Sequence, residues 1–249
     1  MKTGIIGAVA QEVEQLFADL EASGTPVTKT TIGSLEFHEG ILDGCPVVIV
    51  CGGVGKVNAA LCTQILVSVF SVDAIVNSGS AGGLDPRLRV LDMVVSTDAV
   101  HHDMDATWFG YAPGQVPGTA SPFFTADARL RNAAQASFER VAAGIRASLE
   151  GSDTVPAMIE GRIASGDLFV ADAATRARIS SLFSPACVEM EGAAVAQACT
   201  VNKIPFVILR SISDLAGDDA GIAYEDFSEK ASHTSARLVR GMLAELGRM

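Results

Sequence analysis

Four acidic residues occupy positions at which a carboxylate could take part in chemistry. Glu12 follows the first apolar run of the chain, and Asp214 ends the most apolar run of the C-terminal half. Glu189 and Glu191 lie between an apolar segment and a run of small residues. A carboxylate is costly to remove from water unless it has a partner or a task. At the ends of neighbouring strands these residues would form one acidic pocket suited to proton transfer, although Glu12 alone is also typical of a helix cap.

The elements that must position these acids alternate along the chain. Short β-branched runs predict strands, several apolar throughout, as in a sheet covered on both faces. The expected strands are Gly4–Val9, Val47–Cys51, Ala74–Asn77, Met93–Ser96 and Phe206–Ile212. The expected helices are Gln11–Leu20, Val57–Val72, Ala126–Leu149, Ala173–Leu182, Gly192–Val201 and Glu225–Leu246. This alternation predicts an α/β fold whose site lies where glycine clusters follow the strands, at 52–55 and 79–83.

Composition excludes several classes of protein. The 249 residues carry 18 Lys+Arg against 29 Asp+Glu, a net charge of −11, and 49% of them are hydrophobic. A chain this apolar can order a core, and one this acidic repels nucleic acid and anionic membranes. The five cysteines include no C-x-x-C pair, which indicates core residues in a reducing compartment. We find no signal peptide or spanning segment, and expect one domain over residues 1–249 in the cytoplasm.

Two glycine-containing segments suggest other activities that their details disfavour. The segment 52–56 resembles a phosphate-binding P-loop but lacks the first glycine and the final Ser/Thr of that motif. The segment 78–82 resembles the nucleophile elbow of serine hydrolases, and Asp214 and His233 follow it in triad order. That elbow also lacks its first glycine, and His233 belongs to a polar helical run, so geometry must decide.

The segment His101–Asp105 offers four potential metal ligands in five residues. Adjacent side chains cannot all converge on one ion, so we expect no metal site. The same segment opens an irregular stretch, 101–124, that contains three prolines and five aromatic residues. A loop of this length and composition predicts a lid or a subunit contact.

Seven segments, taken in order, carry a resemblance to a known family. They are GIIGAVAQEV, GGVGKVNAA, VNSGSAGGL, HDMDATWFGYAPGQVPG, ASGDLFV, VEMEGAAVAQ and PFVILRSISDLA. Together they resemble the purine nucleoside phosphorylase/hydrolase superfamily, and most closely the bacterial 5′-methylthioadenosine/S-adenosylhomocysteine nucleosidases. The resemblance implies a single three-layer α/β/α domain with a central twisted mixed sheet, usually in a homodimer. It also implies hydrolysis of the N-glycosidic bond of adenine thionucleosides without metal or cofactor.

The resemblance further implies roles for individual residues. Asp214 would protonate or hydrogen-bond purine N7, Glu12 would activate water at the anomeric carbon, and Glu191 would bind the ribose hydroxyls. The remaining residues expected to contact the substrate are Val9, Val54, Ser80, Phe169, Val170, Glu189, Met190, Arg210, Ser213 and Tyr224. Phe169 would stack on adenine, but it and Met190 are equally typical of a core, and Arg210 of a structural ion pair. A partner subunit would add Ala106, Phe109 and Pro117 to the pocket for the 5′ substituent.

Two departures from the family leave the substrate open. Ala106 is smaller than usual and Trp108 is bulkier, so the 5′ group could be methylthio, homocysteinyl, deoxyadenosyl or that of 6-amino-6-deoxyfutalosine. Two other functions also stay open. A phosphorylase of the same superfamily would use phosphate, which Glu12 would repel. A non-catalytic nucleoside-binding or storage protein would have no reason to keep three acids in its site.

Overall fold

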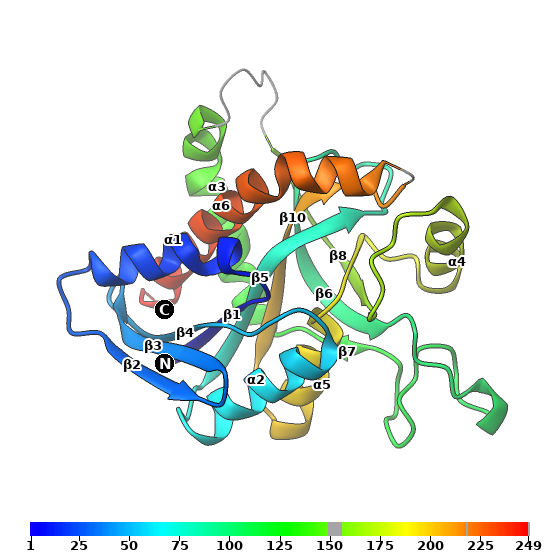
Figure 1. Ribbon diagram of the computed structural model, residues 1–249, viewed down its shortest axis with the longest axis horizontal. Coiled ribbons are helices and arrows are strands. Elements are labelled where there is room, and N and C mark those ends of the chain that lie inside the picture. The colour runs from blue at the N-terminus through cyan, green and yellow to red at the C-terminus, as the bar shows by residue number, and fades with distance from the viewer. Residues whose placement is uncertain (149–155, 218, 249) are drawn as a thin grey trace.

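One mixed sheet of ten strands forms the centre of the computed structural model (Figure 1). The structure describes residues 1–148, 156–217 and 219–248, and the strands belong to these residues. They are β1 (Thr3–Gly7), β2 (Thr28–Ile32), β3 (Leu35–Leu42), β4 (Cys45–Cys51), β5 (Ala74–Gly83), β6 (Met93–His101), β7 (Phe124–Thr125), β8 (Met158–Ser165), β9 (Cys187–Glu189) and β10 (Phe206–Asp214).

The strand order brings the ends of several strands to one edge. β1 lies parallel to both β4 and β5, and β5 lies parallel to β10, so the carboxyl ends of all four point the same way. β5 also pairs with β9, with Val188 opposite Gly82 near the end of β5. Since β10 pairs with β6, β6 with β8 and β8 with β9, these strands close into a ring with β5. Glu12 after β1, Asp214 at the end of β10 and Glu189 in β9, which runs antiparallel to the last residues of β5, therefore lie near the same end of the sheet.

Helices cover both faces of this sheet. The helices are α1 (Ala10–Glu21), α2 (Lys56–Ser68), α3 (Ala128–Ser148), α4 (Ala173–Phe183), α5 (Gly192–Asn202) and α6 (Ala220–Leu246), with a 3₁₀ turn η1 (Thr107–Phe109). α1 and α6 lie on one face, and α2 and α5 lie on the other (Figure 1). In β1, Ile5 packs into the core cluster with α1, α3 and α6, whereas Ile6 packs into the cluster with α2 and α5. Alternating side chains thus serve two cores, which explains the fully apolar strands and confirms the three-layer α/β/α prediction.

Several boundaries differ from the sequence prediction. The antiparallel pair β2–β3 was not predicted, because β2 is largely exposed and its sequence, TKTTI, is mostly polar. β5 continues to Gly83 rather than ending at Asn77, so its glycines lie within a strand. α2 ends at Ser68 rather than Val72, and α6 begins at Ala220 rather than Glu225. Leu149, the expected end of α3, lies outside the described residues.

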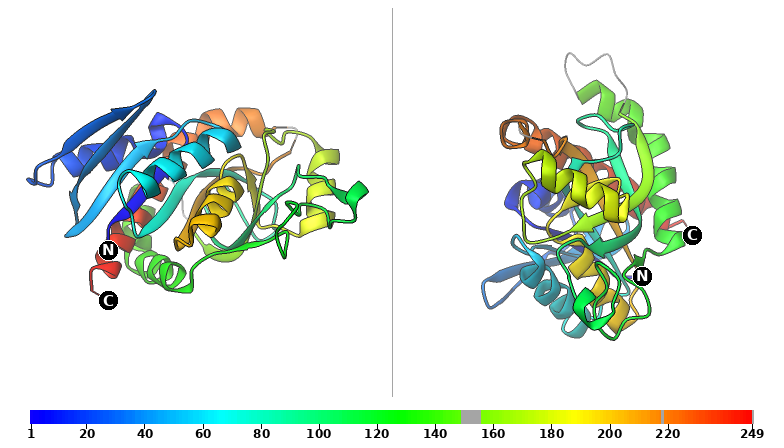
Figure 2. Two further views of the ribbon diagram at one scale, coloured as in Figure 1. Left: turned by 90° about the horizontal axis from the view of Figure 1, so that it is seen from below. Right: turned by 90° about the vertical axis from the view of Figure 1, so that its right-hand side faces the viewer.

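The segment between β6 and β7 extends away from the sheet, and η1 lies at the periphery of the molecule (Figure 2). The five cysteines are free thiols, and Cys45, Cys62, Cys187 and Cys199 are buried, as expected for small core residues. Within the described part of the chain, no helix combines the length and hydrophobicity needed to cross a membrane.

Candidate active site

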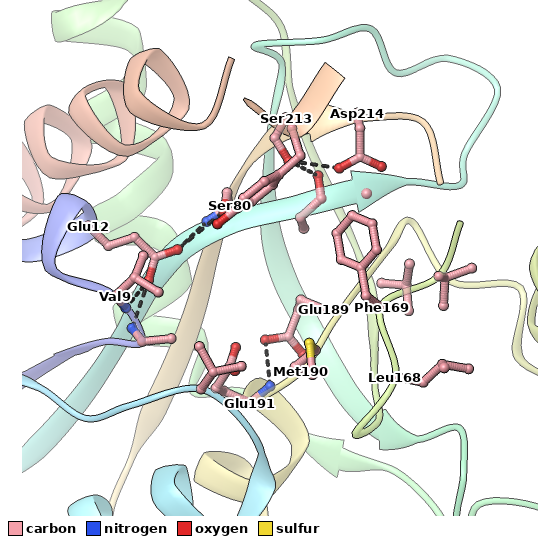
Figure 3. Close-up of a pocket in the computed structure, with 17 residues that line it drawn as sticks. Val9, Glu12, Ser80, Leu168, Phe169, Glu189, Met190, Glu191, Ser213 and Asp214 are labelled. Atoms are coloured by element: carbon pink, nitrogen blue, oxygen red, sulfur yellow. Dashed lines mark hydrogen bonds between the residues drawn. The ribbon is translucent and has the colours of Figure 1, made fainter. Parts of the chain in front are cut away.

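A cavity of about 230 Å³ lies beside the carboxyl ends of β1, β5 and β10 (Figure 3). The sequence-predicted residues that line it are Val9, Glu12, Val54, Ser80, Phe169, Val170, Glu189, Met190, Glu191, Ser213, Asp214 and Tyr224. The lining residues that the sequence did not single out are Ala8, Ala81, Gly82, Leu168 and Val188. Each of these lies within two positions of a predicted residue, so adjacency in the same strand or loop was the available signal.

Both carboxylate oxygens of Glu12 are held by hydrogen-bond donors. Oε2 accepts the backbone N–H of Ala8 at 2.7 Å and of Val9 at 3.4 Å. Oε1 accepts the backbone N–H of Ser80 at 2.9 Å and its hydroxyl at 3.2 Å. Glu12 therefore caps α1 and faces the cavity in one fixed orientation. A Cβ at Gly79 would lie 2.5 Å from Oε1, so a larger residue at this strand position would displace the carboxylate.

Asp214, the last residue of β10, is turned toward the cavity by a register shift after Ile212 that sets it opposite Gly82. Its Oδ1 accepts the backbone N–H of Ala216 at 2.7 Å, and its Oδ2 accepts the Ser213 hydroxyl at 2.9 Å. Burial raises the pKa of the Asp214 carboxyl, although both hydrogen bonds oppose the rise. A raised pKa makes the proton more available near neutral pH, as a general acid requires.

Arg210 forms a buried ion pair with Glu189 and does not line the cavity. The guanidinium, 2% exposed, also donates to Asn77 Oδ1 at 2.7 Å. Glu189 additionally accepts the Ser165 hydroxyl and the backbone N–H of Gly192. Burial disfavours the charge on Glu189, but Arg210 and these donors hold the pKa of its carboxyl below the usual value. Arg210 therefore forms the structural ion pair that was the alternative to a role in substrate binding. The Glu189 oxygens are occupied by hydrogen bonds and the ion pair within the protein.

Glu191, directly before α5, keeps one oxygen available to a ligand. Oε1 accepts the backbone N–H of Gly55 at 2.8 Å, whereas Oε2 lies 4.0 Å from the Arg210 guanidinium. Burial, and then repulsion by Glu189, raises the pKa of the Glu191 carboxyl to about 7. Its ability to accept two hydroxyl hydrogen bonds therefore changes with pH close to neutrality.

Replacing Glu191 by glutamine should stabilise the protein at alkaline pH. Folding raises the pKa of the Glu191 carboxyl from 4.5 to about 7. Its protonation therefore stabilises the folded state fully at pH values below the unfolded pKa, and this stabilisation is lost as the pH rises through 7. The free energy of unfolding of Glu191→Gln relative to the wild type should rise by about 2 kcal/mol from about pH 5 to about pH 8. Urea unfolding followed by circular dichroism measures this, and a difference independent of pH would contradict it.

Apolar side chains form the remaining wall of the cavity. The rings of Phe169 and Tyr224 meet edge to face, with centroids 5.9 Å apart and planes at 76°. Phe169 is 45% exposed. This exposure disfavours its interpretation as a core residue and favours its interpretation as a substrate contact. Leu168 and Met190 extend the same surface (Figure 3), and Val170 also lines the cavity. An aromatic and aliphatic wall beside carboxylates is suited to a flat base joined to a sugar.

The residues expected from a partner subunit lie away from the cavity of their own chain. None of Ala106, Phe109 and Pro117 lines it. Ala106 is buried, but Phe109 is 77% exposed and its neighbour Trp108 is 92% exposed. Phe109 belongs to the peripheral turn η1 (Figure 2). Any contact of these side chains with a ligand would therefore be made in a second copy of the chain.

In the part of the chain that the structure describes, the geometry supports neither the serine-hydrolase nor the metal interpretation. Ser80, the serine at the nucleophile position of the elbow, donates its hydroxyl to Glu12 Oε1 at 3.2 Å, whereas His233 is exposed on α6. His101 is buried, with Nε2 2.9 Å from Gln197 Oε1. Among the described residues, no group of three His, Cys, Asp or Glu side chains could hold a metal ion.

The glycine-rich turn before α2 binds carboxylates of its own chain rather than a phosphate. The backbone N–H of Gly55 donates to Glu191, and that of Lys56 donates to Asp167 at 2.8 Å. These are the N–H groups that a P-loop would offer to an anion. The turn therefore does not act as a P-loop. It anchors the start of α2 to Glu191 and Asp167.

Comparison with known proteins gives consistent matches. A model of the phosphorylase superfamily matches residues 2–244. The 5′-methylthioadenosine/S-adenosylhomocysteine nucleosidase of Treponema pallidum is 43% identical over 99% of this chain and 94% of its own length.

Solved structures agree with these sequence matches. The nucleosidase of the same name from Colwellia psychrerythraea, in complex with adenine, has a TM-score of 0.89 at 42% identity, over 99% of this chain and 96% of that one. The Neisseria meningitidis nucleosidase, in complex with methylthio-immucillin-A, has a TM-score of 0.87 at 38% identity over 98% of both chains. A futalosine hydrolase of Helicobacter pylori has a TM-score of 0.87 at 29% identity, over 100% of this chain and 98% of that one.

Proposed function

The chain belongs to the 5′-methylthioadenosine/S-adenosylhomocysteine nucleosidases of the phosphorylase superfamily, and we propose that it hydrolyses the N-glycosidic bond of both nucleosides. The products are adenine and the 5′-substituted ribose. The observation that carries this function is the presence of three carboxylates, Glu12, Glu191 and Asp214, around one cavity with an aromatic wall (Figure 3). 5′-Deoxyadenosine has the same base and sugar and is a further candidate substrate.

In the proposed mechanism each of the three carboxylates acts on a different group: the base, the sugar or the attacking water. Asp214 donates its proton to adenine N7, and the electrons of the C1′–N9 bond leave with the base. The sugar becomes oxocarbenium-like, and Glu12 removes a proton from the water that attacks C1′. Glu191 accepts hydrogen bonds from the ribose hydroxyls. The proton that Asp214 gives to the base is matched by the proton that Glu12 takes from the water. The steps therefore require only side chains and water.

Charge around the cavity favours water over phosphate as the nucleophile. The lining residues include four carboxylates and no Lys or Arg, and the nearby Arg210 is paired with Glu189. A phosphate dianion would have to approach uncompensated acids, which repel it. This supports hydrolysis over the phosphorylase alternative.

The experiment that tests the proposed function is an adenine-release assay with purified protein and a panel of nucleosides. Methylthioadenosine and S-adenosylhomocysteine should both be cleaved. Preferred cleavage of 6-amino-6-deoxyfutalosine would instead support the alternative of a 6-amino-6-deoxyfutalosine hydrolase. Binding of all three without any adenine release would support the storage protein. Because these substrates share base and sugar, the assay also identifies the preferred 5′ group.

We also propose that the chain acts as a homodimer in which the loop 101–124 closes the pocket of the partner. Trp108 and Phe109 are too exposed to be explained by packing within one chain. Exposed aromatic residues are enriched at protein interfaces. Two chains of net charge −11 repel each other, so burial of apolar surface must supply the association. A symmetric dimer would then complete both pockets at once.

Replacing Phe109 by aspartate should weaken the dimer and raise the KM for methylthioadenosine together. The substitution puts a charge where the proposed interface buries an aromatic ring. Sedimentation velocity and the adenine-release assay, run on the same samples, measure both effects. Ile41→Asp, at an exposed apolar position of β3, serves as the matched control and should change neither. A monomeric wild type with full activity in dilute solution would contradict the proposal.

Two broader features complete the proposal. The core clusters on both faces share the same strands, which supports one domain over residues 1–249. Free thiols at all five cysteines support a reducing compartment, hence the cytoplasm. The proposed partners are a small nucleoside and a second copy of the chain, with no nucleic acid or membrane.

A further inference from the structure

Three residues outside the cavity lining form a closed ring of hydrogen bonds. The backbone N–H of Lys56 donates to Asp167 Oδ1 at 2.8 Å. The backbone N–H of Asp167 donates to Asp103 Oδ2 at 3.0 Å. The Lys56 ammonium then donates to Asp103 Oδ1 at 2.6 Å and closes the ring. The three residues come from the start of α2, the segment after β6 and the segment after β8, so the ring ties together parts of the chain that are distant in sequence.

Two sides of this ring continue directly into the walls of the cavity. Gly55, next to Lys56, donates its N–H to Glu191. Leu168, Phe169 and Val170, which follow Asp167, line the aromatic side of the cavity. The fit is close, because a Cβ at Gly55 would lie 3.1 Å from Asp167 Oδ1, and Gly55 has a φ of +96° that favours glycine.

We propose that Lys56, Asp103 and Asp167 are positioning residues that hold Gly55 against Glu191 and fix the wall formed by residues 168–170. They touch no substrate and act through Glu191 and that wall. This inference rests on the proposed function, because it assigns the ring an effect on the binding of the ribose and the base.

Loss of the ion pair between Lys56 and Asp103 would affect the cavity. The side chains of Lys56 and Asp103 are 20% and 30% exposed, so removal of the ammonium leaves a largely covered carboxylate without its cation. Asp103 would then repel the neighbouring carboxylate of Asp167, and the turn at Gly55 would lose its support.

Loosening this turn has a consequence for the titration of Glu191. The charged groups facing Glu191 are Glu189 on β9, Arg210 on β10 and Glu12 on α1. All three stay in place when Lys56 changes, so only the hydrogen bond from Gly55 is weakened. Since a hydrogen bond to the carboxylate favours its charged form, weakening it moves protonation of Glu191 to higher pH.

Lys56→Met, which removes the ammonium but keeps the backbone N–H, tests the proposal. With methylthioadenosine, the KM should rise about fivefold to tenfold while kcat changes less than about threefold. The acid limb of the pH profile of kcat/KM should move to higher pH. Lys56→Arg should restore both properties because it restores the cation. Lys29→Met is the matched control, because it breaks the exposed ion pair of 2.7 Å between Lys29 on β2 and Glu21 at the end of α1.

The outcomes separate this inference from the proposed function. A wild type that does not cleave methylthioadenosine overturns the function, whatever Lys56→Met does. An active wild type with unchanged KM and pH profile in Lys56→Met overturns the positioning role and leaves the function standing. If Lys56→Met does not fold, Asp103→Asn, which keeps the side-chain volume, should show the same increase in KM and the same pH shift. Unchanged values in folded Asp103→Asn also overturn the inference.

Discussion

Turnover of methylthioadenosine should fall by about 10²–10⁴-fold when Asp214 is replaced by asparagine, while the substrate still binds. An amide can hydrogen-bond purine N7 but cannot deliver a proton to it. The side chain is shaped like aspartate, so its oxygen can still accept the N–H of Ala216 that now holds Oδ1 at 2.7 Å. Single-turnover kinetics separate the chemical step from binding, and equilibrium binding of the uncleaved substrate measures the affinity.

Asp172→Asn is the matched control for this variant. Asp172 caps α4 by accepting the N–H of Thr175 at 2.8 Å, and asparagine is an equally good capping residue. The control should therefore keep both its fold and its turnover. A 7-deaza analogue of methylthioadenosine provides a second check, because without N7 it should bind and resist cleavage. Turnover of Asp214→Asn within a few-fold of the wild type would show that no proton from Asp214 is needed.

Glu12→Gln should lower turnover by a similar factor, about 10²–10⁴-fold, because glutamine cannot accept a proton from water. One amide oxygen can still accept the hydrogen bonds from Ser80, but the NH₂ group would face the N–H of Ala8, which now donates to Oε2 at 2.7 Å. A modest loss of stability should accompany the loss of turnover. Binding of a transition-state analogue should persist in part, since Asp214 and Glu191 remain.

Glu14→Gln, at an exposed position two residues further along α1, controls for any effect of charge on the helix. Thermal unfolding of both variants shows how much of the change comes from the fold. If added phosphate restored the turnover of Glu12→Gln, phosphate would be identified as the nucleophile. This result would contradict the role of Glu12 as the base that activates water.

The sequence singled out the acids that line the cavity for a physical reason. Glu12 and Asp214 each interrupt or end an apolar run, and a carboxylate at such a position is conspicuous because its desolvation needs an explanation. Parallel strands bring such ends together, so strand order did not have to be known in detail. The aromatic wall was assigned by resemblance, and only its exposure distinguishes Phe169 from a core residue.

What the sequence could not predict depends on contacts between distant segments. The pairing of Arg210 with Glu189 joins β10 to β9, and no spacing rule connects the two residues. The glycines of β5 were expected at a strand end, yet Gly79 lies within the strand, where a Cβ would come 2.5 Å from Glu12 Oε1. The pair β2–β3 escaped prediction because β2, which is largely exposed and mostly polar, lacks an apolar signal.

Hydrolysis in ¹⁸O-labelled water tests the central claim most directly. Methylthioadenosine should release adenine in phosphate-free buffer, and the sugar product should carry one ¹⁸O atom by mass spectrometry, because the attacking oxygen comes from water. Added phosphate should change neither the rate nor the label. A strict requirement for phosphate, with a phosphorylated and unlabelled sugar as the product, would contradict the account.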